Sequence, residues 1–123
     1  MTPLLVFLGA GIGGVARYGI SRWMMPPGGF DFPWATLLIN VSGSFLITFL
    51  IGWMHTRGMS IQRQDFVAVG FCGGFTTFSA FSVETLRLME SGHAPRALAY
   101  VALSITLGLL AALLGLRVAP GHA

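Results

Sequence analysis

Residues 70–81, GFCGGFTTFSAF, combine residue types that could bind ions inside an otherwise apolar stretch. Adjacent glycines and adjacent threonines weaken a helix, and a weakened helix leaves backbone carbonyls without N–H partners. Such carbonyls could coordinate a cation if they are buried in protein or face a cavity. The hydroxyls of Thr76, Thr77, Ser79 and Ser82 could satisfy this backbone or face a pathway. An unbroken helix that uses its small residues for packing is the alternative, and the pattern does not decide between them.

Four phenylalanines recur at helical spacing in the same stretch, namely Phe71, Phe75, Phe78 and Phe81. Residues three or four apart share one face of a helix, and such a stripe usually serves packing. The edge of an aromatic ring is electropositive, so ring edges that point into a narrow path could also favour a small anion.

Three further polar side chains interrupt apolar stretches. Asn40 lies within LLINVSGSF, and its amide could join two helices or donate hydrogen bonds to an anion. Tyr100 and Ser104 lie four residues apart and share a helix face. They form either a track of hydroxyl donors or an interfacial tyrosine beside a packing serine.

Two ionisable residues also lie within apolar stretches, where a central charge costs about 2.5–3.5 kcal/mol. Arg17, in GGVARYG, could be a structural anchor or could attract anions at a vestibule. Glu84 could pair with an arginine or carry protons. The sequence does not rank these roles.

All these side chains need elements that hold them in a membrane. Of 123 residues, 54% are hydrophobic and only 9% are charged, whereas soluble domains carry about 25% charged residues. We therefore expect one all-α integral membrane domain over residues 1–123. Apolar runs of about 20 residues predict four transmembrane helices, at about residues 4–23, 34–55, 65–89 and 96–117.

Several other classes of function are disfavoured. The net charge of +3 comes from scattered arginines, so no nucleic-acid partner is expected. Cys72 is the single cysteine, which excludes an internal disulfide and leaves no partners for a zinc site. His55, His93 and His122 have no second ligand at helical spacing. The first basic residue is Arg17, deep in the first apolar run, so this run predicts a retained helix rather than a signal peptide.

The arginines nearly balance across the membrane. One side holds Arg22 and Arg96, with Arg87 one turn inside, and the other holds Arg57, Arg63 and Arg117. A weak bias permits both orientations, as in dual-topology proteins whose copies pair antiparallel; one dominant orientation is the alternative. Four helices wall off little of a polar route, so we expect oligomers. The small-xxx-small pairs Gly9/Gly13 and Gly70/Gly74 suit close helix packing, although glycine is common in membrane helices.

With these residues in place, the chain resembles the small fluoride-channel family known as Fluc or CrcB. The resemblance covers essentially the whole chain and rests on GGVARYG, ATLLINVSGSF and GFCGGFTTFSAFSVET in that order. It implies an antiparallel dual-topology homodimer with two fluoride pores and a third helix broken in mid-membrane. The break would place the carbonyls of Gly73 and Thr76 from both subunits around a structural sodium ion.

The resemblance also implies residue roles. Pore and fluoride-binding residues would be Asn40, Thr77, Phe78, Phe81, Ser82, Tyr100 and Ser104. Arg17 and Glu84 match the family's arginine and glutamate in helices one and three, as vestibule or structural charges. The implied function is passive export of cytoplasmic fluoride across a bacterial inner membrane, without catalysis.

The chain departs from the family pattern at three positions. Ala80 stands where a threonine hydroxyl is common, Ala35 where glycine is frequent, and Gly108 where some relatives carry a hydroxyl. The change at Ala80 bears on conductance rather than on the fold.

Two other functions fit four short helices. A small multidrug exporter would need a carboxylate in the first helix, and this chain has none there. A membrane assembly factor would explain the glycines, but not Asn40, the weakened helix and the hydroxyl track together.

Overall fold

The computed structural model describes residues 1–25 and 32–121, and this part of the chain is helical apart from short connections. Four helical stretches are long and apolar enough to cross a membrane, namely Thr2–Trp23, Trp34–Thr56, Ile61–Glu90 and Ala94–Val118. The four predicted spans are thus confirmed, and the protein is a multi-pass membrane protein. Most of the predicted connection at 24–33, and His122, lie outside the described residues.

Three of the four stretches are continuous helices: α1 (Thr2–Trp23), α2 (Trp34–Thr56) and α6 (Ala94–Val118). The third comprises α3 (Ile61–Asp65), the π-helical η1 (Phe66–Cys72), α4 (Gly73–Phe75) and α5 (Phe78–Glu90). Pro95 lies in the first turn of α6, where a missing N–H has no intrahelical partner to lose.

The third stretch begins earlier than the sequence suggested. Residues 56–64 were expected to form a polar connection, but α3 already begins at Ile61. The reason is local, because the Ser60 hydroxyl accepts a hydrogen bond from the backbone N–H of Arg63 at 3.3 Å and so caps the helix.

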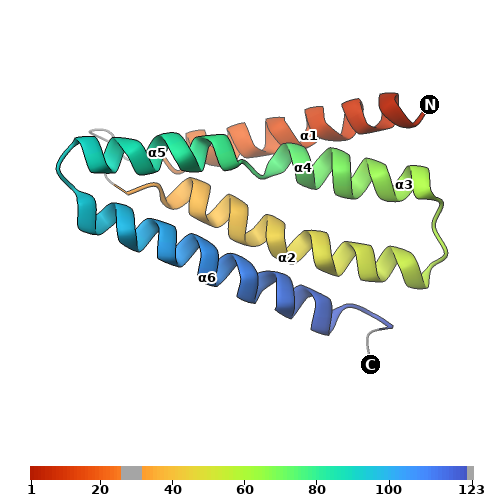
Figure 1. The fold of residues 1–123 in the computed structure, drawn as a ribbon. Helices are drawn as coiled ribbons and strands as arrows, with labels where there is room; N and C mark the ends of the chain where they lie inside the picture. The colour runs from red at the N-terminus through yellow and green to blue at the C-terminus, as the bar shows by residue number, and fades with distance from the viewer. Residues whose placement is uncertain (26–31, 122–123) are drawn as a thin grey trace.

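The helices lie side by side in the order α1, the third stretch, α2 and α6 (Figure 1). Glycines bring α1 against the third stretch, because a Cβ atom added at Gly13 would overlap the carbonyl oxygen of Phe71. One added at Gly74 would overlap the carbonyl oxygen of Ala10. The two predicted glycine pairs therefore meet each other within one chain.

The second contact, between α2 and α6, is equally close. A Cβ atom added at Gly115 would overlap the carbonyl oxygen of Phe45. Beside it, the Thr48 hydroxyl donates to the Ala112 carbonyl oxygen at 2.7 Å. A hydroxyl thus joins the two helices where their backbones approach.

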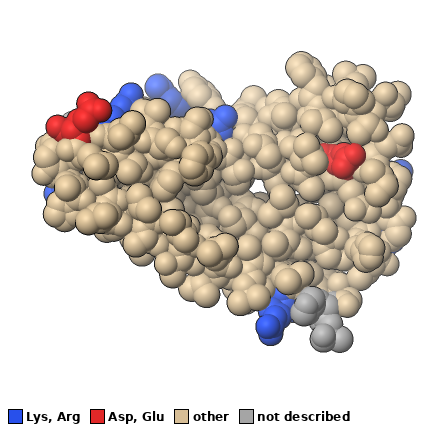
Figure 2. Space-filling model, in the orientation of Figure 1, with Lys and Arg blue, Asp and Glu red and all other residues tan. Residues whose placement is uncertain are grey.

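The outer surface suits a lipid environment. Charged side chains are few on the face seen in Figure 2, and most lie toward the two ends of the helix layer. Large apolar side chains are exposed between them, such as Phe7 on α1 and Leu98 on α6. Such side chains are favourable in contact with acyl chains.

A small buried cluster joins α2, α5 and α6 at one end of the molecule. It consists of Leu37, Leu88, Ala97 and Tyr100, and Phe81 packs against it. This cluster fixes α5 relative to α6, and so sets the position of the polar side chains described next.

Candidate functional site

The helical backbone of the third stretch is interrupted at two residues, which we call the Thr76–Thr77 link. Both residues have extended backbone angles, with φ −84° and ψ 156° at Thr76 and φ −149° and ψ 118° at Thr77. Thr77 is also the N-cap of α5, because its hydroxyl accepts a hydrogen bond from the Ala80 N–H at 3.2 Å. Carbonyls at the end of α4 therefore have no helical N–H ahead of them.

Asn40 on α2 supplies partners for the link. Its side-chain Oδ1 accepts from the Thr77 N–H at 2.8 Å, and its Nδ2 donates to the Thr77 carbonyl oxygen at 3.0 Å. The amide nitrogen carries a second hydrogen. Asn40 thus joins two helices and retains a donor that could face a ligand, which combines the two roles that the sequence left open.

Arg17 on α1 reaches the link from the other side. Its Nε donates to the carbonyl oxygen of Gly74 at 3.2 Å. Among the described residues, no hydrogen bond reaches the carbonyl oxygens of Gly73 and Thr76. These are the two carbonyls that the resemblance assigned to a cation.

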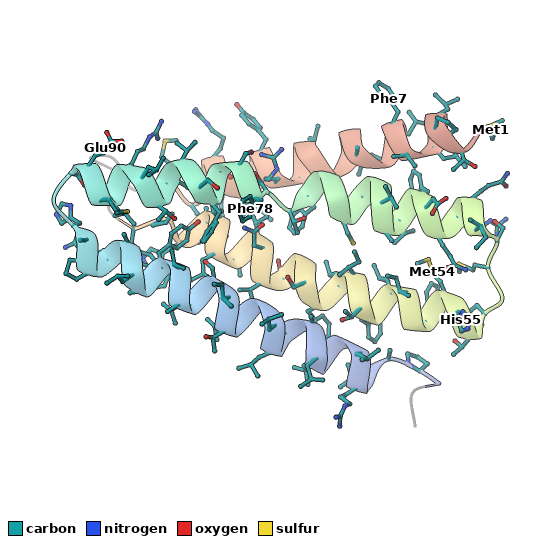
Figure 3. All side chains as sticks on the ribbon, in the orientation of Figure 1. Met1, Phe7, Met54, His55, Phe78 and Glu90 are labelled. Carbon is teal, nitrogen blue, oxygen red and sulfur yellow. The ribbon has the colours of Figure 1, made fainter. Side chains whose placement is uncertain are left out.

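A hollow of about 280 Å³ opens beside the link. Its lining consists of Asn40, Gly43, Ser44, Ile47, Cys72, Gly73, Thr76, Thr77 and Phe78. None of these described lining residues is charged. Phe78 is 78% exposed in the single chain and lies where α4 gives way to α5 (Figure 3).

The phenylalanines do not form the single stripe that their spacing suggested. Phe71 stacks on Phe75 at a centroid distance of 5.8 Å, and Phe75 is only 5% exposed. Beyond the link, Phe78 contacts Phe81 at a centroid distance of 5.6 Å and is largely exposed. The extended link turns the chain between Phe75 and Phe78, so the helical periodicity does not carry across it.

A second polar group lies beyond Phe81, between α5 and α6. The ring of Phe81 lies 5.1 Å from the ring of Tyr100, whose hydroxyl donates to Glu84 Oε1 at 3.2 Å. Tyr100 is fully buried, with its hydroxyl bound to Glu84 on the neighbouring helix. One turn further along α6, the buried Ser104 Oγ has no hydrogen-bond partner among the described residues.

Three other hydroxyls near the site donate to backbone carbonyls four residues before them in the chain. Thr76 Oγ1 donates to the Cys72 carbonyl oxygen at 3.0 Å, and Ser82 Oγ donates to that of Phe78 at 3.1 Å. Ser44 Oγ likewise donates to the Asn40 carbonyl oxygen at 2.7 Å. They satisfy local backbone, one of the alternatives that the sequence allowed.

The sequence-based prediction did not include two residues of the site. Gly43 lets the link approach α2, since a Cβ atom there would overlap Cγ2 of Thr76. Thr36 is buried, and its side chain lies close to those of Glu84 and Tyr100. Both share a helix face with Asn40, at spacings of three and four residues, which is the signal that could have found them.

The structure thus groups the sequence-predicted residues into two neighbouring sets. Asn40, Gly73, Thr76, Thr77 and Phe78 line the hollow. A second set, from Phe81 through Tyr100 to Glu84, extends along α5 and α6.

Ser104 continues that second set by its place on α6, whereas Arg17 approaches from α1. No three His, Cys, Asp or Glu side chains of the described residues are grouped to hold a metal ion.

Comparison with known proteins places these features in a family. The family model described as CrcB-like protein, Camphor Resistance (CrcB), matches residues 4–116. A protein of Rhizobium meliloti (strain 1021) named fluoride-specific ion channel FluC is 46% identical, over 92% of this chain and 91% of its own. Proteins of the same name from Thermus thermophilus (strain ATCC BAA-163) and Methylocella silvestris are 46% and 44% identical, over 93% and 94% of this chain and 90% of each relative. The chain, with its four membrane-spanning stretches, belongs to the CrcB-like family, a family of ion channels and not of enzymes.

Proposed function

We propose that this protein is a passive, fluoride-selective ion channel. Its relatives are named fluoride-specific ion channels, and they match nearly the whole chain. The observation that carries the proposal is the uncharged hollow beside the link, where the Asn40 amide, backbone and hydroxyl groups and the Phe78 ring converge. Such a site offers hydrogen-bond donors to an anion without a lining carboxylate that would repel it.

Fluoride is small and strongly hydrated, so a pore has to replace the water that the ion loses. The second Nδ2 hydrogen of Asn40 and the hydroxyl of Ser104 are donors that the fold leaves available. The edges of Phe78 and Phe81 add weak positive potential between them. Binding at each group must stay weak enough for release.

A sodium ion fits the carbonyls of the link. The oxygens of Gly73 and Thr76 accept no hydrogen bond from the described residues, and hard cations prefer oxygen ligands. When bound, the ion would supply a fixed positive charge that favours anions nearby. We assign its ligands to these two residues in each of two subunits.

The functional unit is proposed to be an antiparallel, dual-topology homodimer with two pores. Phe78 is largely exposed in the single chain, and a second subunit could cover it. The nearly balanced arginines permit both orientations. A two-fold axis in the membrane plane would then repeat the pore and bring the two links together, with the chain broken at mid-membrane depth.

Fluoride would leave the cell down its electrochemical gradient. Acid outside delivers HF, which crosses the bilayer and dissociates inside, and the negative interior then drives the anion outward. We place the protein in the inner membrane of a bacterium, since the similar channels named above come from bacteria.

The test is anion efflux from liposomes that contain the purified protein. We expect fast fluoride efflux, little chloride efflux, and at least a tenfold slower fluoride efflux for Phe78→Ile, since loss of about 1.4 kcal/mol of stabilisation gives that factor. The matched control is Phe7→Ile on α1, because Phe7 is exposed to a similar degree and points away from α2 (Figure 3).

Equal fluoride and chloride efflux, or none from folded protein, would reject the channel proposal. Equal effects of the two phenylalanine variants would reject the pore position at Phe78.

A further inference from the structure

We propose that Arg17 is a positioning residue whose Nε–H holds the Gly74 carbonyl and so leaves the Gly73 and Thr76 carbonyls free at the link. The proposal rests on the proposed channel function and deepens it. It gives Arg17 a role through one bond to the backbone rather than through its charge.

The packing of α1 fixes where the guanidinium lies. Gly13 presses against the backbone of the third stretch, and a Cβ atom there would overlap the Phe71 oxygen and lie 2.8 Å from the Phe75 nitrogen. Arg17 is four residues further along α1 and shares that face. The close glycine contact therefore brings Arg17 to the end of α4, where its Nε meets the Gly74 oxygen at 3.2 Å.

The bond selects which carbonyls stay available. Extended angles at Thr76 deprive the preceding carbonyls of their helical partners. Arg17 donates a hydrogen bond to the Gly74 carbonyl oxygen, and Asn40 donates one to the Thr77 carbonyl oxygen. The carbonyls of Gly73 and Thr76, together with that of Phe75 between them, remain without a hydrogen bond from the described residues.

The surroundings argue against an ordinary ion pair. No carboxylate among the described residues forms a salt bridge with Arg17. Residues 61–75 form a continuous helical run whose last carbonyls, at Gly74 and Phe75, lack helical N–H partners, so an N–H donor is favourable there. The arginine is thus satisfied by a carbonyl at a helix end instead of an acid.

Three substitutions separate the donor from the charge. In Arg17→Gln, Nε2 is the same number of bonds from the backbone as the arginine Nε, so the variant keeps the donor and loses the charge. In Arg17→Lys, a methylene group occupies that position and the charge remains. In Arg17→Met, a methyl group occupies it, and both donor and charge are lost.

We expect Arg17→Gln to retain fluoride efflux within about twofold, while Arg17→Lys and Arg17→Met lose about tenfold or more, the size that a hydrogen bond from a charged donor gives. If Arg17 instead attracts anions by its charge, Arg17→Lys retains efflux and Arg17→Gln loses it. Any result in which Arg17→Gln is no closer to the wild type than Arg17→Lys overturns the proposal.

A spectroscopic signature tests the bond without any fluoride transport. Labelling with carbonyl-¹³C glycine and ¹⁵N phenylalanine selects three peptide groups, those of Gly29–Phe30, Gly70–Phe71 and Gly74–Phe75. Phe75→Leu removes and so identifies the Gly74 signal. We expect its ¹³C shift to move in Arg17→Lys and Arg17→Met but not in Arg17→Gln.

An unmoved Gly74 signal in folded Arg17→Met protein overturns the proposal, whatever the efflux. Wild-type protein that passes no fluoride would overturn the channel function instead, and the carbonyl signal would still report on the bond. The two failures are therefore distinguishable.

Discussion

At the scale of single residues, most hydroxyls of the site donate hydrogen bonds to the backbone, whereas one buried hydroxyl has no partner. Thr76, Ser82 and Ser44 donate to backbone carbonyls four residues before them in the chain. The buried Oγ of Ser104 has no partner among the described residues. A buried polar group without a partner costs about 1–3 kcal/mol, so this hydroxyl does not stabilise the fold through a hydrogen bond.

We predict that Ser104→Ala leaves the melting temperature unchanged or slightly higher, because no hydrogen bond is lost. Fluoride efflux should nevertheless fall, by about three- to tenfold for one neutral donor of about 1 kcal/mol. The control is Thr106→Val, on the same helix but exposed. A marked loss of thermal stability in Ser104→Ala would show that the hydroxyl has a structural partner.

At the scale of elements, the link depends on how closely α1 packs against the third stretch. Four glycines remove the side chains that would otherwise separate the two backbones, and the carbonyls of Phe71 and Ala10 fill the space. Helices in lipid associate through such van der Waals contact, because lipid tails are as apolar as the side chains. The same contact brings Arg17 to Gly74.

We predict that Gly13→Ala destabilises the protein by about 1–3 kcal/mol, because the new methyl group overlaps backbone that cannot move independently. Gly14→Ala is the matched control, since a Cβ atom there has no neighbour within 4 Å. That variant should be equal or slightly more stable, as alanine is the better helix former. Thermal unfolding in detergent measures both, and similar values for the two variants would contradict the packing.

At the scale of the whole molecule, the two ends of the helix layer carry similar numbers of arginines. The end of α1, with Arg22, and the start of α6, with Arg96, lie at the end with the α5–α6 turn (Figure 1). The end of α2, the start of α3 and the end of α6 lie toward the other end, and they carry Arg57, Arg63 and Arg117. Insertion follows such differences, and a small difference allows both orientations. In the proposed antiparallel dimer, the exposed Phe78 is the part of the site that the second subunit would cover.

We predict that Thr56→Cys and Ala94→Cys, exposed at opposite ends, are each labelled to about half by an impermeant maleimide on intact cells, as mixed insertion requires. Permeabilised cells should be labelled fully. The wild type is the control, because Cys72 is only 2% exposed. Complete labelling at one position and none at the other would establish a single orientation and exclude the antiparallel dimer.

The sequence by itself determined the membrane class and the four spans, because long apolar runs and scarce charges leave a chain few other stable states. Its motifs also indicated the family, which the comparison with known proteins confirmed. It could indicate that residues 73–77 weaken a helix, since glycine and threonine act locally through backbone freedom and hydroxyl bonding.

Tertiary structure alone decided how the weakened segment is satisfied. Asn40 and Arg17 lie 37 and 57 residues from their partners Thr77 and Gly74, and no periodicity reports on such contacts. The prediction that the phenylalanines share one helix face was wrong. The extended link between Phe75 and Phe78 interrupts the helical periodicity, so residues on its two sides do not share a face. Local sequence sets which backbone groups are released, and packing between distant helices sets which of them remain free.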